Sequence, residues 1–277
     1  MFSPYYHFSG RKAPENHVAF NVAFYNPSGS VWAMTERGSD SLIRTCEGLR
    51  IGNSGLTWSN GGLELEFEET ALPWPGHRFL PRRFSGRIRV EPDFLHANSF
   101  DLDADGRHVW WPRVPQARVK VNCDLLPNGG WEGEGYHDVN FGSRPLETDF
   151  VAWDWARGRA RNNRTVVLYD AEMRSGGQRT LGLAFSAAGA AEPIDLPQRR
   201  ALPRGAWGVR GGIHCDASAT PTRSRRLEDT PFYTRSLVET TLAGEPLKMV
   251  HETLDCRRLA NPAVRMMLPF RMPRNSR

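Results

Sequence analysis

One segment of the sequence gathers acidic, phenolic and amide side chains at every second position. As a β-strand, the stretch from Trp131 to Phe141 turns five polar side chains to one face: Glu132, Glu134, Tyr136, Asp138 and Asn140. A face with three carboxylates is costly to bury, so packing alone does not explain it. A solvated outer face is the alternative interpretation, and against it stand a tyrosine and two glycines among the acids.

Aromatic side chains lie on both sides of this segment in the sequence. Residues 150–157 place Trp153 and Trp155 on one face of a strand, and upstream His108 and Trp110 share a face. A carboxylic acid in an apolar pocket has a raised pKa and can donate a proton. Indole faces can then stabilise the resulting cation. These residue types together indicate a site that forms and shields a carbocation.

Other kinds of chemistry leave no pattern in the chain. The eight histidines include no H-E-x-x-H motif and no pair four residues apart, and the four cysteines form no C-x-x-C pair. Glycine-rich phosphate-binding motifs and the G-x-S-x-G elbow are also missing. We therefore expect no metal, no organic cofactor and no disulfide framework.

The elements that must position these residues are predicted to be strands. Apolar and polar residues alternate over residues 20–24, 63–68 and 118–125, which is typical of antiparallel strands with one wet face. One short helix is expected, over residues 261–267, with Pro262 in its first turn. Between the strands lie pairs and triplets suited to tight hairpins: Asn60-Gly61-Gly62, Asp105-Gly106, Asn128-Gly129-Gly130 and Ser175-Gly176-Gly177.

Many short strands joined by tight turns predict an all-β fold. A chain of 277 residues is long enough for two consecutive antiparallel barrel or sandwich units. Such a barrel can enclose an apolar ligand cavity, which some of the nine tryptophans would line. Aromatic side chains that simply fill the core are the alternative.

These residues resemble the acyclic carotenoid 1,2-hydratases, also called hydroxyneurosporene synthases, of carotenoid-producing bacteria. The core Gly-Tyr-x-Asp-x-Asn is shared with a wider lipocalin-like superfamily that includes pericyclases, whereas the C-terminal stretches are more specific to the hydratases. The resemblance implies two tandem lipocalin-like domains, residues 1–145 with the acidic strand and residues 146–277 with a basic tail. It rests on stretches throughout the chain: residues 19–25, 32–38, 106–112, 133–140, 153–157, 228–233 and 267–273.

The family also implies a reaction, the cofactor-independent addition of water to the terminal C1=C2 bond of an acyclic carotene such as neurosporene or lycopene. Asp138 resembles the family's proton donor, and Tyr136 shares its strand face. His108 and Trp110 resemble the supporting residues, although a shift by one position to Trp111 is open. We expect four further side chains to contact the substrate: Trp111, Asn140, Trp153 and Trp155.

Two other functions fit the same superfamily. A pericyclase would shape the cyclisation of a polyene without proton transfer, so its product would keep the mass of the substrate. A non-catalytic carrier would bind a carotene without turnover. Such a carrier would have little use for Glu132, Glu134 and Asp138 on one strand face.

The basic charge of the chain is confined to its C-terminal end. The formal net charge is +5, yet the residues after Asp255 include six arginines and no acid, so the preceding 255 residues sum to −1. A nearly neutral body argues against nucleic-acid binding. Arginines interleaved with apolar residues suit an anionic membrane surface, and a tail packed on the barrel is the alternative.

We expect a cytoplasmic protein that meets the inner or photosynthetic membrane peripherally. The sequence has no apolar run long enough to span a bilayer and no secretory signal. It leaves open the preferred carotene, the number of waters added and the oligomeric state.

Overall fold

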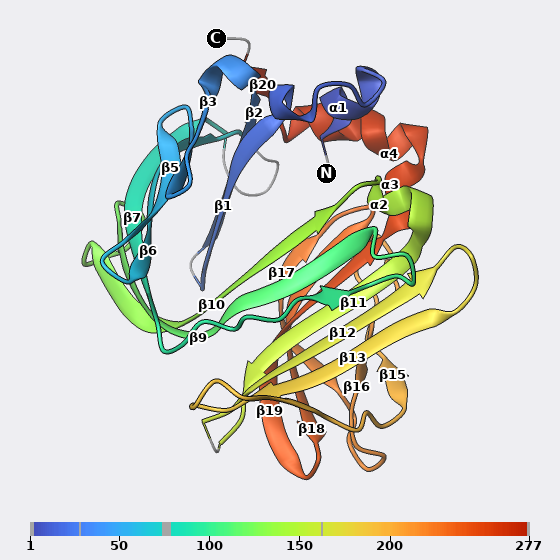
Figure 1. The fold of residues 1–277 in the computed structure, drawn as a ribbon. Coiled ribbons are helices and arrows are strands. Elements are labelled where there is room, and N and C mark those ends of the chain that lie inside the picture. Colours follow the sequence, from blue (N-terminus) through green and yellow to red (C-terminus); the bar gives the residue numbers. More distant parts are fainter. Residues whose placement is uncertain (1–2, 28, 74–78, 162, 276–277) are drawn as a thin grey trace. The chain divides into compact units, whose positions relative to one another are not determined.

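β-Strands make up most of the computed structural model, which describes residues 3–27, 29–73, 79–161 and 163–275 (Figure 1). This confirms the predicted all-β class. The chain divides into two compact units, the first with residues 1–92, 117–135 and 265–277, the second with residues 93–116 and 136–264. The division differs from the single boundary expected at residue 145, because two long strands, β9 (His108–Cys123) and β10 (Gly130–Gly142), each contribute residues to both units.

The first unit contains strands from both ends and the middle of the chain. One sheet has the order β1-β2-β20, and in another the strands β9, β7, β6, β5, β4 and β3 follow one another. The elements are α1 (Pro4–Phe8), η1 (Pro14–Asn16), β1 (Val18–Asn26), β2 (Gly29–Arg37), η2 (Ser39–Ser41), β3 (Leu42–Arg44), β4 (Gly48–Ile51), β5 (Ser54–Ser59), β6 (Gly62–Ala71), β7 (Arg82–Pro92), η3 (Leu268–Phe270) and β20 (Arg274–Asn275).

The alternating residues predicted from the sequence form the core of this unit. Phe67 of β6 and Phe84 of β7 are buried and meet edge to face, with their ring centroids 5.8 Å apart. The turn between β5 and β6 is one of the predicted hairpins. Asn60 and Gly61 have φ values of 48° and 70°, the positive values that a two-residue type I′ turn requires.

A buried carboxylate ties the C-terminal segment to the first unit. Glu36 of β2 is fully buried, and its carboxylate pairs with the guanidinium of Arg274 in β20, which runs parallel to β2. His17 Nδ1 lies 2.8 Å from the same carboxylate, and the hydroxyl of Ser3 donates to it. Because a buried charge without a partner is costly, this cluster holds the two ends of the chain together.

From Arg265 on, the basic tail is packed within the first unit, as the alternative interpretation of the sequence has it. Arg265 is buried and lies 2.8 Å from His7 Nδ1, and Arg271 stacks 4.3 Å from the ring centroid of Trp32. Arg277 lies outside the described residues. A membrane contact therefore cannot depend on a free basic tail.

The second unit is built on one large antiparallel sheet with the order β14-β13-β12-β11-β19-β18-β17 (Figure 1). A separate two-stranded sheet pairs β15 with β16, and β8 pairs with β9. The elements are β8 (Phe100–Asp101), α2 (Leu146–Asp149), β11 (Phe150–Arg159), β12 (Thr165–Met173), β13 (Gln178–Phe185), β14 (Ala191–Pro193), β15 (Arg199–Ala201), β16 (Gly212–His214), β17 (Thr222–Asp229), β18 (Tyr233–Leu242), β19 (Glu245–Asp255) and α3 (Cys256–Ala260).

Alternation along the strands divides the large sheet of the second unit into two faces. On one face, Ala156 of β11 and Leu168 of β12 belong to a buried apolar core. On the other face, Trp155 of β11 lies directly opposite Tyr169 of β12 and Glu252 of β19. The same strands therefore supply an apolar core on one side and the side chains of Trp155, Tyr169 and Glu252 on the other.

The helices are few and short. The helix expected over residues 261–267 is confirmed as α4 (Pro262–Met267), which begins at Pro262. Asp255 caps α3, since its side chain accepts a hydrogen bond from the backbone N–H of Arg258. In the part of the chain that the structure describes, no helix has both the length and the apolar character that a transmembrane span needs.

Candidate active site

Asp138 lies between an indole and a phenol within the second unit. Its Oδ2 atom accepts a hydrogen bond of 2.8 Å from Nε1 of Trp110 and one of 3.1 Å from the hydroxyl of Tyr136. Trp110 is fully buried, and Asp138 and Tyr136 are partly buried. Both donors converge on one carboxyl oxygen, which leaves Oδ1 to carry the proton when the group is neutral.

The surroundings of Asp138 favour its neutral form. Burial raises the pKa of Asp138 above its ordinary value, the hydrogen bonds from Trp110 and Tyr136 oppose the rise, and the charge of Glu252 adds to it. Burial, and after it the charge of Asp138, also raise the pKa of Tyr136 well above its ordinary value. The phenol therefore keeps its proton and remains a donor, and the carboxyl group has the environment of a general acid.

Aromatic rings surround this carboxyl group. The ring of Trp155 lies 5.5 Å from that of Tyr136, and Tyr169 lies 5.4 Å from Trp110 and 5.9 Å from Trp153 between ring centroids. Such rings can stabilise a cation over their faces, each by up to about 2 kcal/mol when water is excluded. The cluster can thus shelter a positive charge formed next to Asp138.

Arg157 introduces a permanent positive charge beside these rings. Its guanidinium carbon lies 5.4 Å from the ring centroid of Tyr136. The guanidinium of Arg157 occupies this side of the Tyr136 ring. A second positive charge is therefore better accommodated near Trp110, Trp153 and Tyr169.

His108 lies near the site but has its own partners. Its Nε2 is 2.8 Å from Oδ2 of Asp149, and its ring meets Phe150 edge to face at 4.7 Å. Arg144 lies 3.4 Å from the same Asp149. Among the described contacts, none joins His108 to Asp138, so the structure places this histidine in a neighbouring ion-pair cluster.

The remaining predicted site residues lie in different surroundings. Trp111 faces away from Asp138, because its Nε1 donates to the backbone carbonyl of His96 at 3.0 Å. Trp110 rather than Trp111 therefore contacts the carboxyl group. Asn140 is exposed on β10, and so are two acids of the same strand, Glu132 and Glu134.

Two residues of the site were missed in the sequence. Tyr169 lies in a strand whose residues 165–171 are all buried, so no alternation distinguishes its face. Glu252 lies in β19, more than a hundred residues from Asp138, and its Oε1 is 2.8 Å from Nε of Arg235. Only strand pairing brings these side chains to the site.

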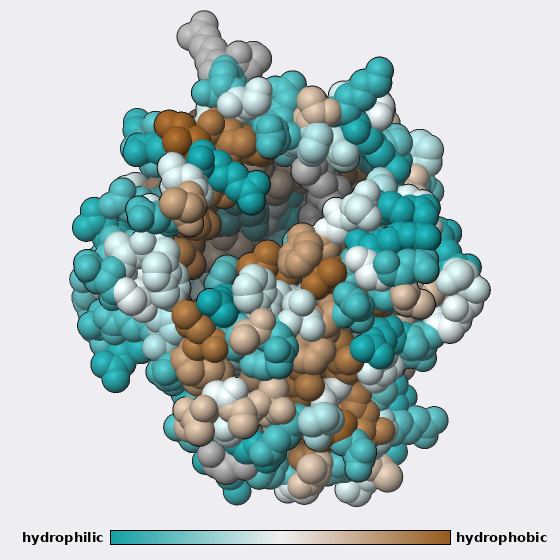
Figure 2. All heavy atoms as spheres, in the orientation of Figure 1, coloured by the Kyte–Doolittle hydropathy of each residue, from teal (hydrophilic) through white to brown (hydrophobic). Residues whose placement is uncertain are grey.

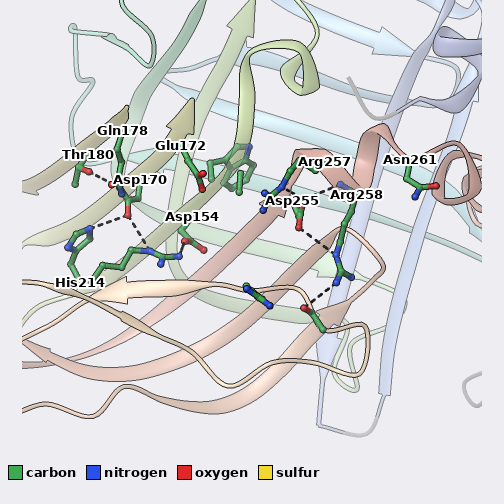
Figure 3. A pocket seen from close by; sticks show the side chains of 15 residues that line it. Asp154, Asp170, Glu172, Gln178, Thr180, His214, Asp255, Arg257, Arg258 and Asn261 are labelled. Carbon is green, nitrogen blue, oxygen red and sulfur yellow. Dashed lines mark hydrogen bonds and ion pairs between the residues drawn. The ribbon is translucent and has the colours of Figure 1, made fainter. Parts of the chain in front are cut away.

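A polar cavity of about 960 Å³ lies in the second unit (Figure 3). Asp170 and Asp154 line it from the strand face opposite to Tyr169 and Trp155. Both carboxylates have partners: Arg199 and His214, each at 3.3 Å, Thr180 at 2.7 Å and Gln178 at 2.6 Å for Asp170, and Arg199 and Thr253 (2.6 Å) for Asp154. These internal pairs explain the polar lining without any reaction.

No set of three or more His, Cys, Asp or Glu side chains within the described ranges converges as metal ligands do. The strands define an all-β, lipocalin-like protein, and its candidate site combines a carboxyl group with aromatic rings. Its comparison with known proteins gives the particular family.

The chain matches the family model of carotenoid hydratase CrtC over residues 1–277. It is 45% identical over 278 residues to an acyclic carotenoid 1,2-hydratase of Thiocapsa roseopersicina, covering 99% of this chain and 67% of the relative. It is also 38% and 36% identical to the proteins of the same name from Cereibacter sphaeroides and Rhodobacter capsulatus, with 95% of each relative covered. The chain belongs to the carotenoid hydratase CrtC family and is therefore a hydro-lyase.

Proposed function

We propose that this protein adds water to the terminal C1=C2 bond of an acyclic carotene, such as neurosporene or lycopene, with Asp138 as the acid. Relatives at 36–45% identity that bear the name acyclic carotenoid 1,2-hydratase support the substrate class. The observation that carries the mechanism is the convergence of Trp110 and Tyr136 on Oδ2 of Asp138.

The first step is proton transfer to carbon. The neutral carboxyl of Asp138 donates its proton to C2, because the charge then develops on the more substituted carbon, C1. As Asp138 becomes a carboxylate, the hydrogen bonds from Trp110 and Tyr136 to Oδ2 strengthen. These two donors therefore stabilise the transition state more than the ground state.

In the second step, water adds to C1 and loses a proton, which gives a tertiary alcohol. The faces of Trp110, Trp153 and Tyr169 stabilise the cation until water attacks. We do not assign His108 as the base, because its described contacts are with Asp149 and Phe150 and none joins it to Asp138. We assign it the role of holding α2 against β9, the strand that carries Trp110.

Asp138→Asn tests the assignment of the acid. In lycopene-producing cells, we expect the wild-type protein to yield pigment heavier by one or two waters and the variant to yield unchanged lycopene. Glu132→Gln, which removes an exposed carboxylate from the same strand, is the matched control and is expected to hydrate normally. Hydration by Asp138→Asn at the wild-type rate would disprove the mechanism.

The mass of the product also separates this function from its alternatives. A pericyclase would return an isomer of unchanged mass. A carrier would hold lycopene in a fixed ratio to protein without converting it. Either result with the wild-type chain would replace the proposed reaction.

We also propose that the protein is cytoplasmic and takes its substrate from a membrane through a patch formed by α4 and η3. Carotenes are insoluble in water, so the enzyme must meet them in lipid. In this segment Met266 is 63% exposed and Phe270 is 79% exposed. Figure 2 shows one face of the molecule, on which hydrophilic and hydrophobic side chains are interspersed. Apolar side chains on a short helix suit shallow insertion among lipid headgroups.

Vesicle flotation tests this contact. The double variant Met266→Ser and Phe270→Ser is expected to bind vesicles of anionic and neutral lipid less than the wild type. Phe79→Ser removes an exposed phenylalanine outside the patch and serves as the control. Equal flotation of all three proteins would refute a membrane contact at α4 and η3.

A further inference from the structure

In the proposed reaction, the water that attacks the cation needs a binding site and a base, and the residues described so far supply neither. We propose that Glu252 is the general base for this water and that the indole N–H of Trp155 orients it. This inference rests on the proposed function, since it supplies the second half of the same reaction.

Glu252 and Trp155 are neighbours across two strands. Trp155 of β11 pairs in register with Glu252 of β19. Side chains directly opposite in an antiparallel pair project to the same face, with Cβ atoms about 5 Å apart. The ring of Trp155 in turn lies 5.5 Å from the ring of Tyr136, whose hydroxyl binds Asp138. The two carboxyl groups are thus linked through one indole and one phenol on one side of the sheet.

Trp155 carries a donor that the described chain leaves unused. Its Nε1 is buried and has no hydrogen-bond partner among the described residues. A buried donor without an acceptor is costly, so it points to a polar molecule at this position. A hydrocarbon polyene offers no acceptor, whereas water does. In this proposal the attacking water accepts from this N–H, on the sheet face that Trp155 shares with its register partner Glu252.

Glu252 and Asp138 occupy different environments. Nε of Arg235 lies 2.8 Å from Oε1 of Glu252, so a cation is the partner of this carboxylate. Asp138 has neutral donors instead, and the nearby charge of Glu252 disfavours its ionisation. Two carboxyl groups with such contrasting surroundings divide into an acid and a base.

The step balances with these two groups alone. A lone pair of the water oxygen forms the bond to C1, and one proton of that water passes to the carboxylate of Glu252. Water bonded to a tertiary carbocation is a strong acid, so a carboxylate can accept this proton. The product leaves as the C1 alcohol, and solvent carries a proton from neutral Glu252 to the Asp138 carboxylate.

Reaction in deuterium oxide separates the two halves of the mechanism. The full chain is incubated with lycopene, and mass spectrometry measures hydrated product and deuterium in the recovered lycopene. With Glu252→Gln we expect hydration to fall by at least tenfold, while recovered lycopene still gains deuterium. The deuteron from Asp138 then forms the cation, but without its base the cation loses a proton from a neighbouring carbon. Trp155→Phe is expected to show the same pattern more weakly.

The matched control is Glu239→Gln. Glu239 pairs with Lys248 at 3.2 Å on the same two strands, β18 and β19, but both side chains are at least half exposed. It is expected to hydrate and exchange as the wild type does. Should Glu252→Gln fold poorly, Glu252→Asp withdraws the carboxylate by one methylene and is expected to lose hydration while keeping exchange.

Two outcomes would overturn the role of Glu252. One is hydration by Glu252→Gln at the wild-type rate. The other is loss of exchange together with hydration in both Glu252 variants, which would mean that this residue acts before the cation forms. Failure of the proposed function gives a different result, because the wild-type chain itself would then form no hydrated product. Failure of the acid assignment alone would leave Asp138→Asn exchanging and hydrating normally.

Discussion

Removal of the Tyr136 hydroxyl tests the mechanism most directly. Tyr136→Phe keeps the ring beside Trp155 and deletes only the donor to Oδ2 of Asp138. A hydrogen bond to a charged group contributes about 1.5–3 kcal/mol. At 3.1 Å this one is longer than the usual distance between hydroxyl and carboxylate oxygens, so the lower end applies. About 1.5 kcal/mol corresponds to a roughly tenfold slower protonation step.

By the same reasoning, Trp110→Phe should slow hydration more than Tyr136→Phe does. Trp110→Phe removes the shorter donor, at 2.8 Å from a fully buried ring, so the upper end of the range applies and the expected loss is about a hundredfold. The assay is the initial rate of lycopene hydration by purified protein in detergent, with product measured by chromatography. Near-ultraviolet circular dichroism checks that both variants fold.

The pH–activity profile of Tyr136→Phe should shift in a direction that a merely structural effect would not produce. Activity needs neutral Asp138, so it is lost as pH rises through the pKa of that group. The Tyr136 hydroxyl lowers this pKa, as does the Trp110 indole, whereas burial and the charge of Glu252 raise it. The alkaline limb of Tyr136→Phe must therefore move to higher pH. A limb that moves to lower pH, or an unchanged rate, would refute the reasoning.

Three further outcomes follow from buried charges. Asp138→Asn should be at least as stable to urea as the wild type at pH 8. Because the pKa of Asp138 is raised in the folded state, its favourable contribution to the free energy of unfolding is present at low pH and is lost as pH rises. Arg274→Ala leaves Glu36 buried without its cation and should lower the free energy of unfolding by about 3 kcal/mol; a loss below about 1 kcal/mol would contradict the role of this pair. The hydrogen bond to Asp170 raises the pKa of His214. The stabilisation that this pair gives the fold is therefore complete below pH 6.5 and is lost as pH rises through the raised pKa. Urea titrations of His214→Gln should lack this alkaline decline in stability.

The strands and turns could be predicted from the sequence because they depend on local chemistry. Alternation over residues 63–68 reflects a sheet with one wet face, and Asn60-Gly61 supplies the positive φ values of a hairpin. The shared face of Tyr136 and Asp138 follows from the same period of two. What the sequence leaves open is which strands become neighbours, since pairing between distant strands has no local signature.

The missing parts of the site come from those distant pairings. Tyr169 lies in a strand that is buried on both faces, where alternation disappears. Glu252 is positioned by the pairing of β11 with β19, and His108 is held by Asp149 through a contact 41 residues along the chain. The division into units likewise depends on long strands shared between both, which a search for one boundary does not find.

The pairing of Glu36 with Arg274 has a consequence for the synthesis of the protein. These residues are 238 positions apart, so β2 leaves the ribosome long before β20 is made. Until β20 is made, the Glu36 carboxylate lacks the guanidinium of Arg274, and part of the first unit's surface is uncovered. Such a nascent chain is a natural client for chaperones that shield exposed strands. The unit that is translated first is therefore the unit that is completed last.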